Sequence, residues 1–219
     1  MHQEKDKPTG ALKDLNSGSY MKGDETLKKD KPKYKQIIDA AVVVIAENGY
    51  HHSQVSKIAK QAGVADGTIY LYFKNKEDIL ISLFEEKMGQ FVSAIKRGME
   101  HEEDAAAQLE ILIKSHFQML ADDRHLAIVT QLELRQSNKD IRLKINKVLK
   151  EYLLLVDEVL HNGAQSGVFQ TDLDIRLARQ MVFGTIDEVA TTWVINDQKY
   201  DITNLAAGVH SLIVRGLSS

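Results

Sequence analysis

The stretch between Ser53 and Lys76 gathers side chains that can bind phosphate oxygens and base edges. Thr68, Tyr70 and Tyr72 place three hydroxyl groups within five residues, and the ammonium group of Lys76 follows four residues later. Proteins contact the DNA backbone with such hydroxyl and ammonium groups, and a small hydroxyl side chain can also reach a base edge. The chemistry that this pattern predicts is the noncovalent recognition of DNA.

Two short helices are predicted to position these groups. Ser53 stands at the N-cap position of the first helix, and Gly63 supplies the positive φ that ends it. In the second helix, Ile69 and Phe73 lie four residues apart and are expected to pack together on the first helix. The residues of the first helix that recur at helical spacing on one face are Val55, Ile58, Ala59 and Ala62.

This arrangement is a helix-turn-helix, a motif whose second helix enters the major groove of DNA. A helical hairpin with a glycine turn also arises from packing alone, so the hairpin by itself leaves both interpretations open. The outer face favours DNA binding, because a buried helix would not carry Thr68, Tyr70 and Tyr72 without partners for their hydroxyl groups.

The sequence shows no convincing constellation for catalysis or metal binding. The chain has no cysteine, which excludes thiol catalysis and disulfides. The run 163–167 is not a nucleophile elbow, because its serine is displaced and no strand precedes it. His51 and His52 are adjacent rather than one helical turn apart, and no acidic ligand accompanies them. His116 lies on an apolar face, where we expect a core histidine rather than a ligand or base. We therefore expect no enzyme activity, no cofactor and no metal site.

Three arginines form a second candidate group. Arg135 ends a mostly apolar segment, and Arg176 and Arg179 begin another. A guanidinium group stays charged and donates paired hydrogen bonds to phosphate, so these arginines can form an anion patch at the mouth of a pocket. Alternatively, Arg135 only caps helix carbonyls or pairs with Glu133 or Asp140 at the surface.

The composition is that of a soluble globular chain, long enough for one large domain or two modest ones. Of its 219 residues, 43% are hydrophobic and 27% are charged. No run approaches the roughly 18 apolar residues of a membrane span, and the N-terminus lacks the apolar segment of a secretion signal. We therefore expect a cytoplasmic protein. The net charge of −3 arises in residues 81–219, so a DNA-binding module must concentrate its few lysines on one face.

Apolar residues recur at helical spacing from Pro32 onward, and no stretch sustains the alternation of a strand. The sequence therefore predicts an all-α fold of about nine helices. Proline, glycine and capping residues place them near residues 32–48, 53–62, 66–73, 75–98, 104–120, 123–137, 138–166, 174–193 and 201–216. Residues 1–31 lack apolar periodicity, and we expect a disordered tail there; a basic arm for the minor groove is the alternative.

The last two predicted helices carry more apolar residues than one buried stripe requires. A helix that is apolar on most sides is buried on most sides, and a monomer would expose such a patch. We therefore expect the eighth and ninth helices to form the seam of a homodimer, which would set two recognition helices about 34–36 Å apart. Asp187 and Glu188 are charged residues inside the otherwise apolar eighth helix. They lie either in this seam or, alternatively, at a ligand cavity.

The helix-turn-helix segment resembles the TetR family of bacterial repressors, in register from Lys33 to Leu83. The matching residues are Asn48-Gly49-Tyr50, Ile58-Ala59, Ala62-Gly63-Val64, Gly67-Thr68-Ile69-Tyr70 and the run from Tyr72 to Leu80. After the tail expected over residues 1–31, the resemblance implies a three-helix DNA-binding domain over 32–78 and a helical ligand-binding and dimerisation domain over 79–219. It also implies a transcriptional repressor that binds operator DNA as a dimer.

Carried over position by position, the resemblance implies DNA contacts from both helices of the motif. Thr68 and Leu71 can reach base edges or a thymine methyl group, whereas the tyrosines and the lysine would hold phosphates. The sequence departs from the family at Ala65 and Asp66, where a hydroxyl residue is often followed by a basic one. The implied contact residues are Ser53, Gln54, Gly67, Thr68, Tyr70, Leu71, Tyr72 and Lys76.

Over residues 31–216 the chain is most similar to the Bacillus-type TetR repressors of fatty-acid degradation. The segments Leu132–Ser137, Arg176–Met181 and Phe183–Glu188 carry this similarity. It implies a long-chain acyl-CoA as inducer, with its chain among aliphatic helices and its phosphates at the arginines. Rival interpretations are a regulator of another hydrophobic ligand, an acyl-CoA carrier or enzyme with a vestigial helix-turn-helix, and a pure dimerisation module. The expected ligand contacts are Phe117, Leu120, Ile128, Leu132, Arg135, Arg176, Arg179, Met181 and Phe183.

Overall fold

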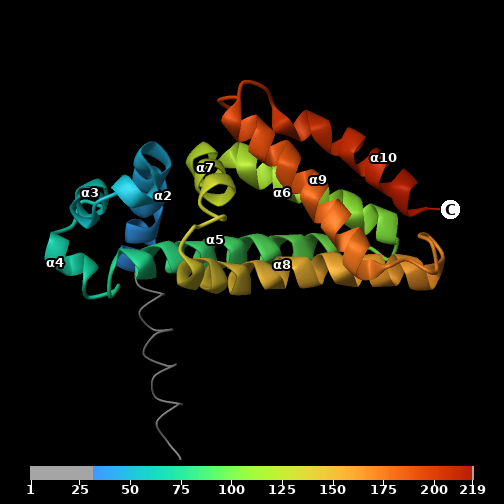
Figure 1. Cartoon of the computed structure of the whole chain (residues 1–219), viewed down its shortest axis with the longest axis horizontal. Helices are drawn as coiled ribbons and strands as arrows, with labels where there is room; N and C mark the ends of the chain where they lie inside the picture. Colours follow the sequence, from blue (N-terminus) through green and yellow to red (C-terminus); the bar gives the residue numbers. More distant parts are fainter. Residues whose placement is uncertain (1–31, 219) are drawn as a thin grey trace, which may run out of the picture.

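The computed structural model describes residues 32–218, which form helices, turns and loops without a strand (Figure 1). This arrangement confirms the predicted all-α fold. The tail predicted over residues 1–31 lies outside the described residues. The helices are α2 (Pro32–His52), α3 (Val55–Gln61), α4 (Asp66–Ile69), α5 (Lys76–Met99), α6 (Ala105–Asp122), α7 (Arg124–Leu132), α8 (Lys139–Ser166), α9 (Ile175–Ile195), the 3-10 helix η1 (Ile202–Leu205) and α10 (Ala206–Leu217).

Capping side chains begin six of the described helices, α5 to α9 and η1, at starting points that the sequence predicts; Asp123 and Asp201 cap α7 and η1. The carboxamide oxygen of Asn75 accepts a hydrogen bond from the backbone N–H of Asp78 at the start of α5. Asp104, Asn138 and Asp174 accept from backbone N–H groups in the first turns of α6, α8 and α9. Each cap satisfies an N–H group that has no partner within its helix, so local sequence sets these starting points.

The cap predicted for α3 is wrong. The hydroxyl of Ser53 donates to the backbone carbonyls of Val44 and Gly49, and Gln54 occupies the N-cap position without a side-chain hydrogen bond. Gly49 has φ 72° inside α2, so the regular helix breaks at the predicted Asn48-Gly49. Ser53 therefore ties α3 back to the end of α2.

Three other predicted helices differ in length. The helix α4 ends at Ile69 rather than near Phe73, because the next N–H groups bond to carbonyls three residues back, in a tighter turn. The helix α7 ends at Leu132 rather than near Ser137, and the following Glu133 accepts a hydrogen bond from α2 instead of continuing the helix. The last predicted helix is divided into η1 and α10.

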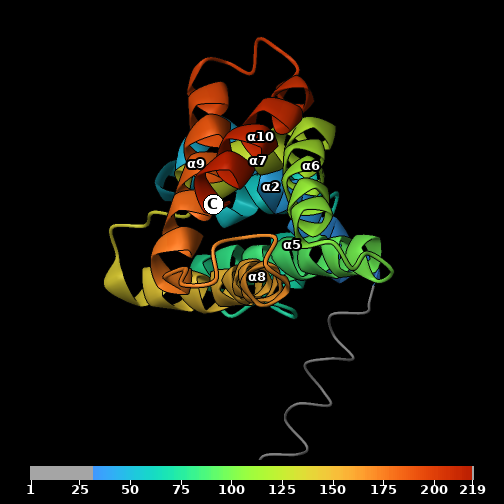
Figure 2. The ribbon, with the colours of Figure 1, turned by 90° about the vertical axis from the view of Figure 1, so that its right-hand side faces the viewer.

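The long helices α5 and α8 lie side by side and start at the same end of the molecule (Figure 1). There, Nζ of Lys144 lies 2.6 Å from Oε1 of Glu77. With 24 residues, α5 is about 36 Å long, so it extends from the α2–α4 unit far into the C-terminal part. The helices α6 and α9 pack over this pair, α10 packs on α6 and α9 (Figure 2), and α7 contacts α2.

Candidate DNA-binding surface and ligand pocket

The hairpin of α3 and α4 lies at one end of the molecule, far from α9 and α10 (Figure 1). Gly63 has φ 63° between the two helices, a conformation that glycine adopts without a Cβ clash. Ile58, Ile69 and Phe73 are buried and hold the hairpin on α2. Because these side chains point inward, the opposite sides of α3 and α4 face solvent.

The exposed side of the hairpin carries five of the predicted contact residues. The side chains of Tyr70 and Leu71 are 59% and 70% exposed, although both are large. Gln54 and Gly67 are also exposed, and Thr68 is half-buried. A large apolar side chain left in water at such a turn is available for contact with the methyl and sugar groups of DNA.

The other three predicted contact residues have partners within the protein. Ser53 is buried, so its hydroxyl is not available at the surface. Tyr72 is half-buried, with its ring centroid 6.4 Å from that of Tyr34. Nζ of Lys76 donates to the carbonyl oxygens of Tyr50 at 3.0 Å and His51 at 3.1 Å. Its charge therefore lies at the C-terminal end of α2, where the helix dipole favours a cation.

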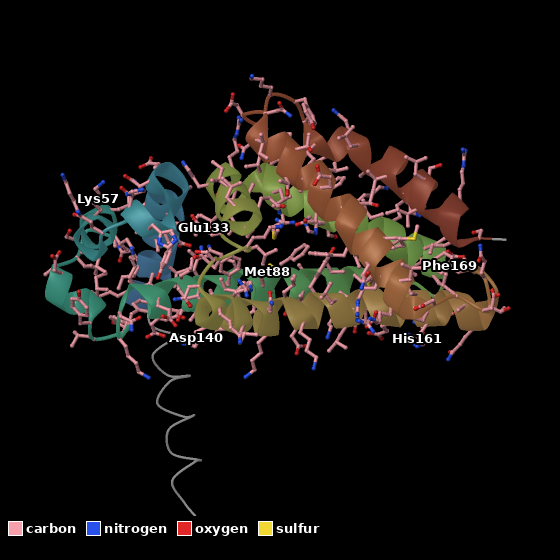
Figure 3. All side chains as sticks on the ribbon, viewed as in Figure 1. Lys57, Met88, Glu133, Asp140, His161 and Phe169 are labelled. Atoms are coloured by element: carbon pink, nitrogen blue, oxygen red, sulfur yellow. The ribbon has the colours of Figure 1, made fainter. Side chains whose placement is uncertain are left out.

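Sequence reasoning did not single out three lysines beside the hairpin. Lys60 and Lys74 are exposed, and Lys57 donates to the side-chain oxygen of Asn48 at 2.9 Å (Figure 3). Their positions within and next to the motif could have indicated them as phosphate contacts, because exposed lysines next to a recognition helix bind phosphates. Asp66 is exposed in the first turn of α4, whose N-cap position belongs to Ala65.

A small cavity lies among α5, α6, α7, α8 and α9. Its volume is about 30 Å³, close to the share of liquid volume that one water molecule occupies. The cavity is narrow in this conformation, so an aliphatic chain can enter only if side chains around it move apart. The lining residues are Phe84, Met88, His116, Met119, Thr130, Gln131, Leu134, Leu149, Tyr152, Phe183 and Asp187.

His116 and Tyr152 form a neutral buried pair at this cavity. Nδ1 of His116 lies 3.0 Å from the hydroxyl oxygen of Tyr152. Burial lowers the pKa of His116 to about 4 and raises the pKa of Tyr152, with a further increase from the charge of Asp187. Both groups are therefore uncharged near neutral pH, and they share one hydrogen bond whose donor is set by the tautomer of the imidazole. This pairing agrees with the predicted core histidine.

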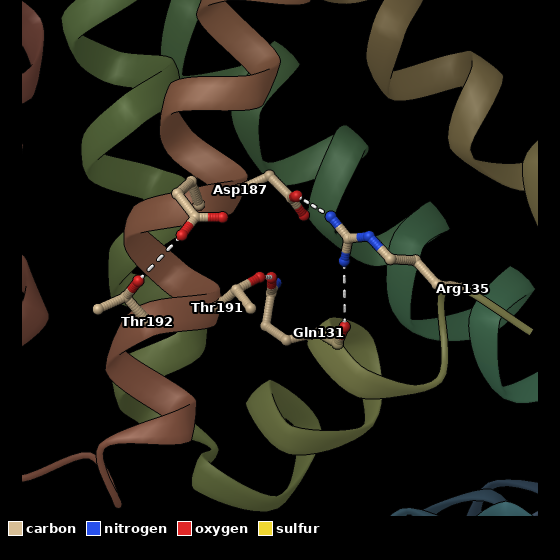
Figure 4. Close-up of polar contacts among 6 residues, drawn as sticks. Gln131, Arg135, Asp187, Thr191 and Thr192 are labelled. Atoms are coloured by element: carbon tan, nitrogen blue, oxygen red, sulfur yellow. Dashed lines mark hydrogen bonds and ion pairs between the residues drawn. The ribbon is translucent and has the colours of Figure 1, made fainter.

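Arg135 and Asp187 form an ion pair at the edge of the cavity (Figure 4). Nη1 of Arg135 also donates to the backbone carbonyl of Gln131 at 3.3 Å, and Thr191 donates to the side-chain oxygen of Gln131 at 3.0 Å. The predicted surface partners of Arg135, Glu133 and Asp140, are wrong. The carboxylate inside the apolar helix instead lines the cavity and neutralises this arginine.

The loop after α7 connects the cavity to the DNA-binding end. Oε1 of Glu133 accepts a hydrogen bond from the backbone N–H of Tyr50 at 2.8 Å, and its other oxygen accepts from the side chain of Gln136. Gln131 and Leu134 flank this glutamate in sequence, and both line the cavity. Residues 131–136 therefore contact the cavity and α2 at the same time.

The remaining predicted ligand residues do not gather around the cavity. Phe183 lines it, whereas Phe117 and Leu120 are fully buried elsewhere in the core. Nη1 of Arg179 donates to Asp157 at 2.7 Å, and Asp187 lies eight residues later, about 12 Å along the helix. The structure therefore does not bring Arg135 and Arg179 into one anion patch. The other predicted residues are half-buried Ile128 and exposed Leu132, Arg176 and Met181.

Within residues 32–218, no helix is long and apolar enough to cross a membrane. The same part of the chain contains no group of three or more histidine and acidic side chains that could hold a metal ion.

Two protein-family models match the chain. One, described as bacterial regulatory proteins of the tetR family, matches residues 37–83. The other, described as the C-terminal region of YsiA-like protein, matches residues 84–216. Together they span the helix-turn-helix and the helices that surround the cavity.

Individual proteins match over most of their length. The chain is 63% identical over 191 residues to the fatty acid metabolism regulator protein of Bacillus subtilis strain 168, covering 87% of this chain and 98% of that one. Two solved structures each have a TM-score of 0.82 and 64% identity, covering 84% of this chain and 99% of theirs. They are the fatty acid degradation regulator FadR from Bacillus halodurans and FadR from B. subtilis in complex with stearoyl-CoA.

Proposed function

The chain belongs to the TetR family of bacterial transcriptional regulators, and we propose that it represses fatty-acid degradation genes until a long-chain acyl-CoA binds. In this proposal, residues 32–78 bind operator DNA and residues 79–219 bind the inducer and dimerise. One observation carries it: residues 131–136 line the cavity through Gln131 and Leu134 and hold the end of α2 through Glu133. A ligand that opens the cavity must therefore act on the DNA-binding end.

The proposed operator contacts come from the exposed side of the hairpin. Thr68 and Leu71 meet base edges and thymine methyl groups, and Gly67 allows the backbone to approach a phosphate. Tyr70 and Gln54 are exposed on the same hairpin and hold the phosphates that set the register. Tyr72 and Lys76 complete this proposed set, with Lys76 also holding the end of α2. Ser53 is left out because it is buried.

The proposed dimer forms through α9 and α10. Leu177 and Met181 on α9 and Leu212 on α10 are large apolar side chains that remain more than half exposed. Gly184 and Gly208 lie inside these helices, and a Cβ at either position would have no atom within 4 Å. A mid-helix glycine lowers helix stability by about 1 kcal/mol, and here it leaves room for a second helix to approach. A two-fold dimer of this kind presents two recognition hairpins to successive major grooves.

The long-chain acyl-CoA is proposed from the relatives together with the cavity. The matched B. subtilis structure is a complex with stearoyl-CoA. In this chain the cavity combines aliphatic and aromatic walls with a few polar groups, which is the usual lining of a ligand pocket. Its volume of about 30 Å³ is far below the roughly 300–1,000 Å³ of occupied pockets. The walls of the cavity must therefore move apart before an acyl chain can enter it.

The proposed mechanism is a population shift. An acyl chain that widens the cavity displaces Gln131 and Leu134, and the intervening Glu133 then loses its place against Tyr50. The end of α2 and the start of α5 change position together, because Lys76 holds the carbonyl of Tyr50. The inducer-bound form no longer matches the half-site spacing, so the ligand favours a state with weak operator affinity.

Titration of operator DNA tests this proposal. Duplexes are first selected from a random library with the full-length protein, and the selected operator is then titrated by fluorescence anisotropy with and without stearoyl-CoA. We expect the ligand to weaken operator affinity at least about tenfold, in the usual range of coupling between sites. Failure to select any duplex would refute the DNA-binding function. Unchanged affinity with saturating stearoyl-CoA would refute this inducer.

A further inference from the structure

The chain turns between α9 and η1 through two consecutive residues in the left-handed conformation. Asp197 has φ 58° and Gln198 has φ 53°, and no other residue of 32–218 except glycine has a positive φ. Glycine usually occupies such a position after a helix, because a Cβ is strained there. Two adjacent residues with side chains keep this geometry only where the surrounding contacts hold it. We call residues 196–200 the α9–η1 corner.

Backbone hydrogen bonds close the end of α9 at this corner. The N–H of Asp197 donates to the carbonyl of Val194 at 3.1 Å, and the N–H of Gln198 donates to the carbonyl of Trp193 at 2.9 Å. A glycine at either position could make the same bonds, because they use no side-chain atom. They therefore do not explain why the side chain of Gln198 is buried, with 7% of the residue exposed.

The buried side chain of Gln198 binds the first residue of α7. Its amide oxygen accepts a hydrogen bond from Nε of Arg124, and its Nε2 donates to the carbonyl of Arg124 at 2.9 Å. Nη2 of Arg124 donates to the backbone carbonyls of Gln198 at 2.9 Å and Asp197 at 3.1 Å. Four hydrogen bonds therefore join segments that lie 74 residues apart. We call this set the Arg124–Gln198 clamp.

The clamp holds the start of α7, and Glu133 holds the residue after its end. Oε1 of Glu133 accepts from the backbone N–H of Tyr50 at 2.8 Å. Between these two attachments, α7 lies between α2 and α9 and contacts both helices (Figure 1). Glu133 is about 13 Å along the helix axis from Arg124. The helix α7 therefore connects the α9–η1 corner to the DNA-binding end.

The cavity lies near the far end of α7. Gln131 lines it and is about 10 Å along the helix axis from Arg124. With the start of α7 fixed, a displacement at Gln131 rotates the helix about Arg124, and the displacement at Glu133 is larger by roughly a third. With the start free, α7 can shift or tilt as a whole, and the same displacement need not move Glu133.

We propose that Arg124 and Gln198 are positioning residues that fix the start of α7 to the α9–η1 corner and so make it the pivot between the cavity and α2. The corner connects α9 to η1 and α10, so the pivot is tied to the helices of the proposed dimer seam. The clamp acts through Glu133 and contacts neither DNA nor inducer. Its effect on the response to the inducer rests on the proposed function, whereas its hold on the end of α2 does not.

A purely local clamp is the alternative. In that case the clamp only ends α9 and begins α7, and its loss would change residues 124–128 and 196–200 alone. A positioning role extends to Tyr50, because the N–H of Tyr50 is bound at the other end of α7. The two roles therefore differ in what happens at Tyr50.

Hydrogen exchange of the full-length protein distinguishes these roles without a ligand. Gln198→Gly removes the side chain of the clamp and tolerates the positive φ. We expect the backbone N–H of Tyr50 to exchange at least about fivefold faster in this variant than in wild type, because its acceptor is held less firmly. Faster exchange confined to residues 124–128 and 196–200 would overturn the positioning role.

Asp197→Gly is the matched control. It places a glycine at the adjacent left-handed position, keeps the backbone carbonyl that Arg124 binds, and loses only an exposed ion pair with Lys199. Exchange at Tyr50 should equal that of wild type. Acceleration at Tyr50 equal to that in Gln198→Gly would show that a glycine in the corner is sufficient, and it would overturn the role of the clamp.

Arg124→Met tests the other side of the clamp. It removes the guanidinium donors, keeps an unbranched apolar side chain and should accelerate exchange at Tyr50 as Gln198→Gly does. The double variant Arg124→Met/Gln198→Gly should show no further acceleration, because both changes break the same set of hydrogen bonds. Multiplied effects in the double variant would refute a clamp that acts as a unit.

Operator titration tests the response to the inducer. The selected operator is titrated with and without stearoyl-CoA. Where the ligand weakens wild-type affinity at least about tenfold, we expect Asp197→Gly to respond equally and Gln198→Gly to respond at most about threefold. An equal response in Gln198→Gly would overturn the pivot. No response in wild type would refute the proposed inducer, and the exchange at Tyr50 would still decide whether the clamp holds the end of α2.

Discussion

The ion pair between Arg135 and Asp187 predicts a coupling between stability and operator binding. The Asp187 side chain is 8% exposed and the Arg135 side chain 57%, so Arg135→Met leaves a buried carboxylate without its partner. Breaking a fully buried pair destabilises a protein by about 3–5 kcal/mol, whereas an exposed pair contributes about 0–1 kcal/mol. Because Arg135 is more than half exposed, we expect an intermediate loss of about 1–3 kcal/mol.

The measurement is a double-mutant cycle by urea unfolding at fixed protein concentration. Arg135→Met, Asp187→Asn and the double variant are compared with wild type. The double variant removes both charges, so it should recover part of the loss, with a coupling energy of about 1–2 kcal/mol. In parallel, Arg135→Met should weaken operator binding, because the residues after α7 lose their attachment to α9.

A second ion pair on the same helix is the matched control. Arg179 and Asp157 form an ion pair at 2.7 Å, away from residues 131–136. Its cycle, with Arg179→Met and Asp157→Asn, should show a coupling energy in stability but no change in operator affinity. Additive effects in the Arg135–Asp187 cycle, or an equal effect of both cycles on operator affinity, would refute the reasoning.

Three further outcomes are expected. Burial lowers the pKa of His116 from 6.5 to about 4. As pH falls, the imidazole of His116 is therefore protonated in the unfolded chain before it is protonated in the folded protein. The free energy of unfolding should drop by about 3 kcal/mol between about pH 6.5 and 4. His116→Asn should flatten that part of the stability curve. Leu71→Ala changes an exposed side chain and should leave stability within about 0.5 kcal/mol, yet lower operator affinity in anisotropy titrations; unchanged affinity would exclude Leu71 from the contact surface. Leu212→Asp should convert the dimer into monomers in analytical ultracentrifugation, and a persistent dimer would exclude α10 from the seam.

Much of the fold follows from short-range sequence signals. Asn75 and Asn138 begin helices because their side chains bond to N–H groups two or three residues later. Gly167 ends α8 with φ 77°, where an L side chain would be strained. The exposed Tyr70 and Leu71 also agree with the predicted outer face of the hairpin. These features depend on neighbours within one helical turn, so the sequence alone contains the necessary information.

Partners distant in sequence could not be predicted in this way. Arg135 pairs with Asp187, 52 residues away, rather than with the nearby Glu133 or Asp140. The hydroxyl of Ser53 and the ammonium group of Lys76 bond to backbone carbonyls of Gly49 and Tyr50 at the end of α2, partners that the sequence did not indicate. Which acceptor such a side chain meets depends on how the helices pack.

The sequence by itself determined the all-α fold, most helix starts and the recognition hairpin, because periodicity and capping act between close neighbours. Only the tertiary structure decided that Glu133 reaches Tyr50, 83 residues away, and that the arginines form separate ion pairs. These relations require several helices to meet in space. Sequence patterns between neighbouring residues do not specify that geometry. The packing of the buried side chains specifies it.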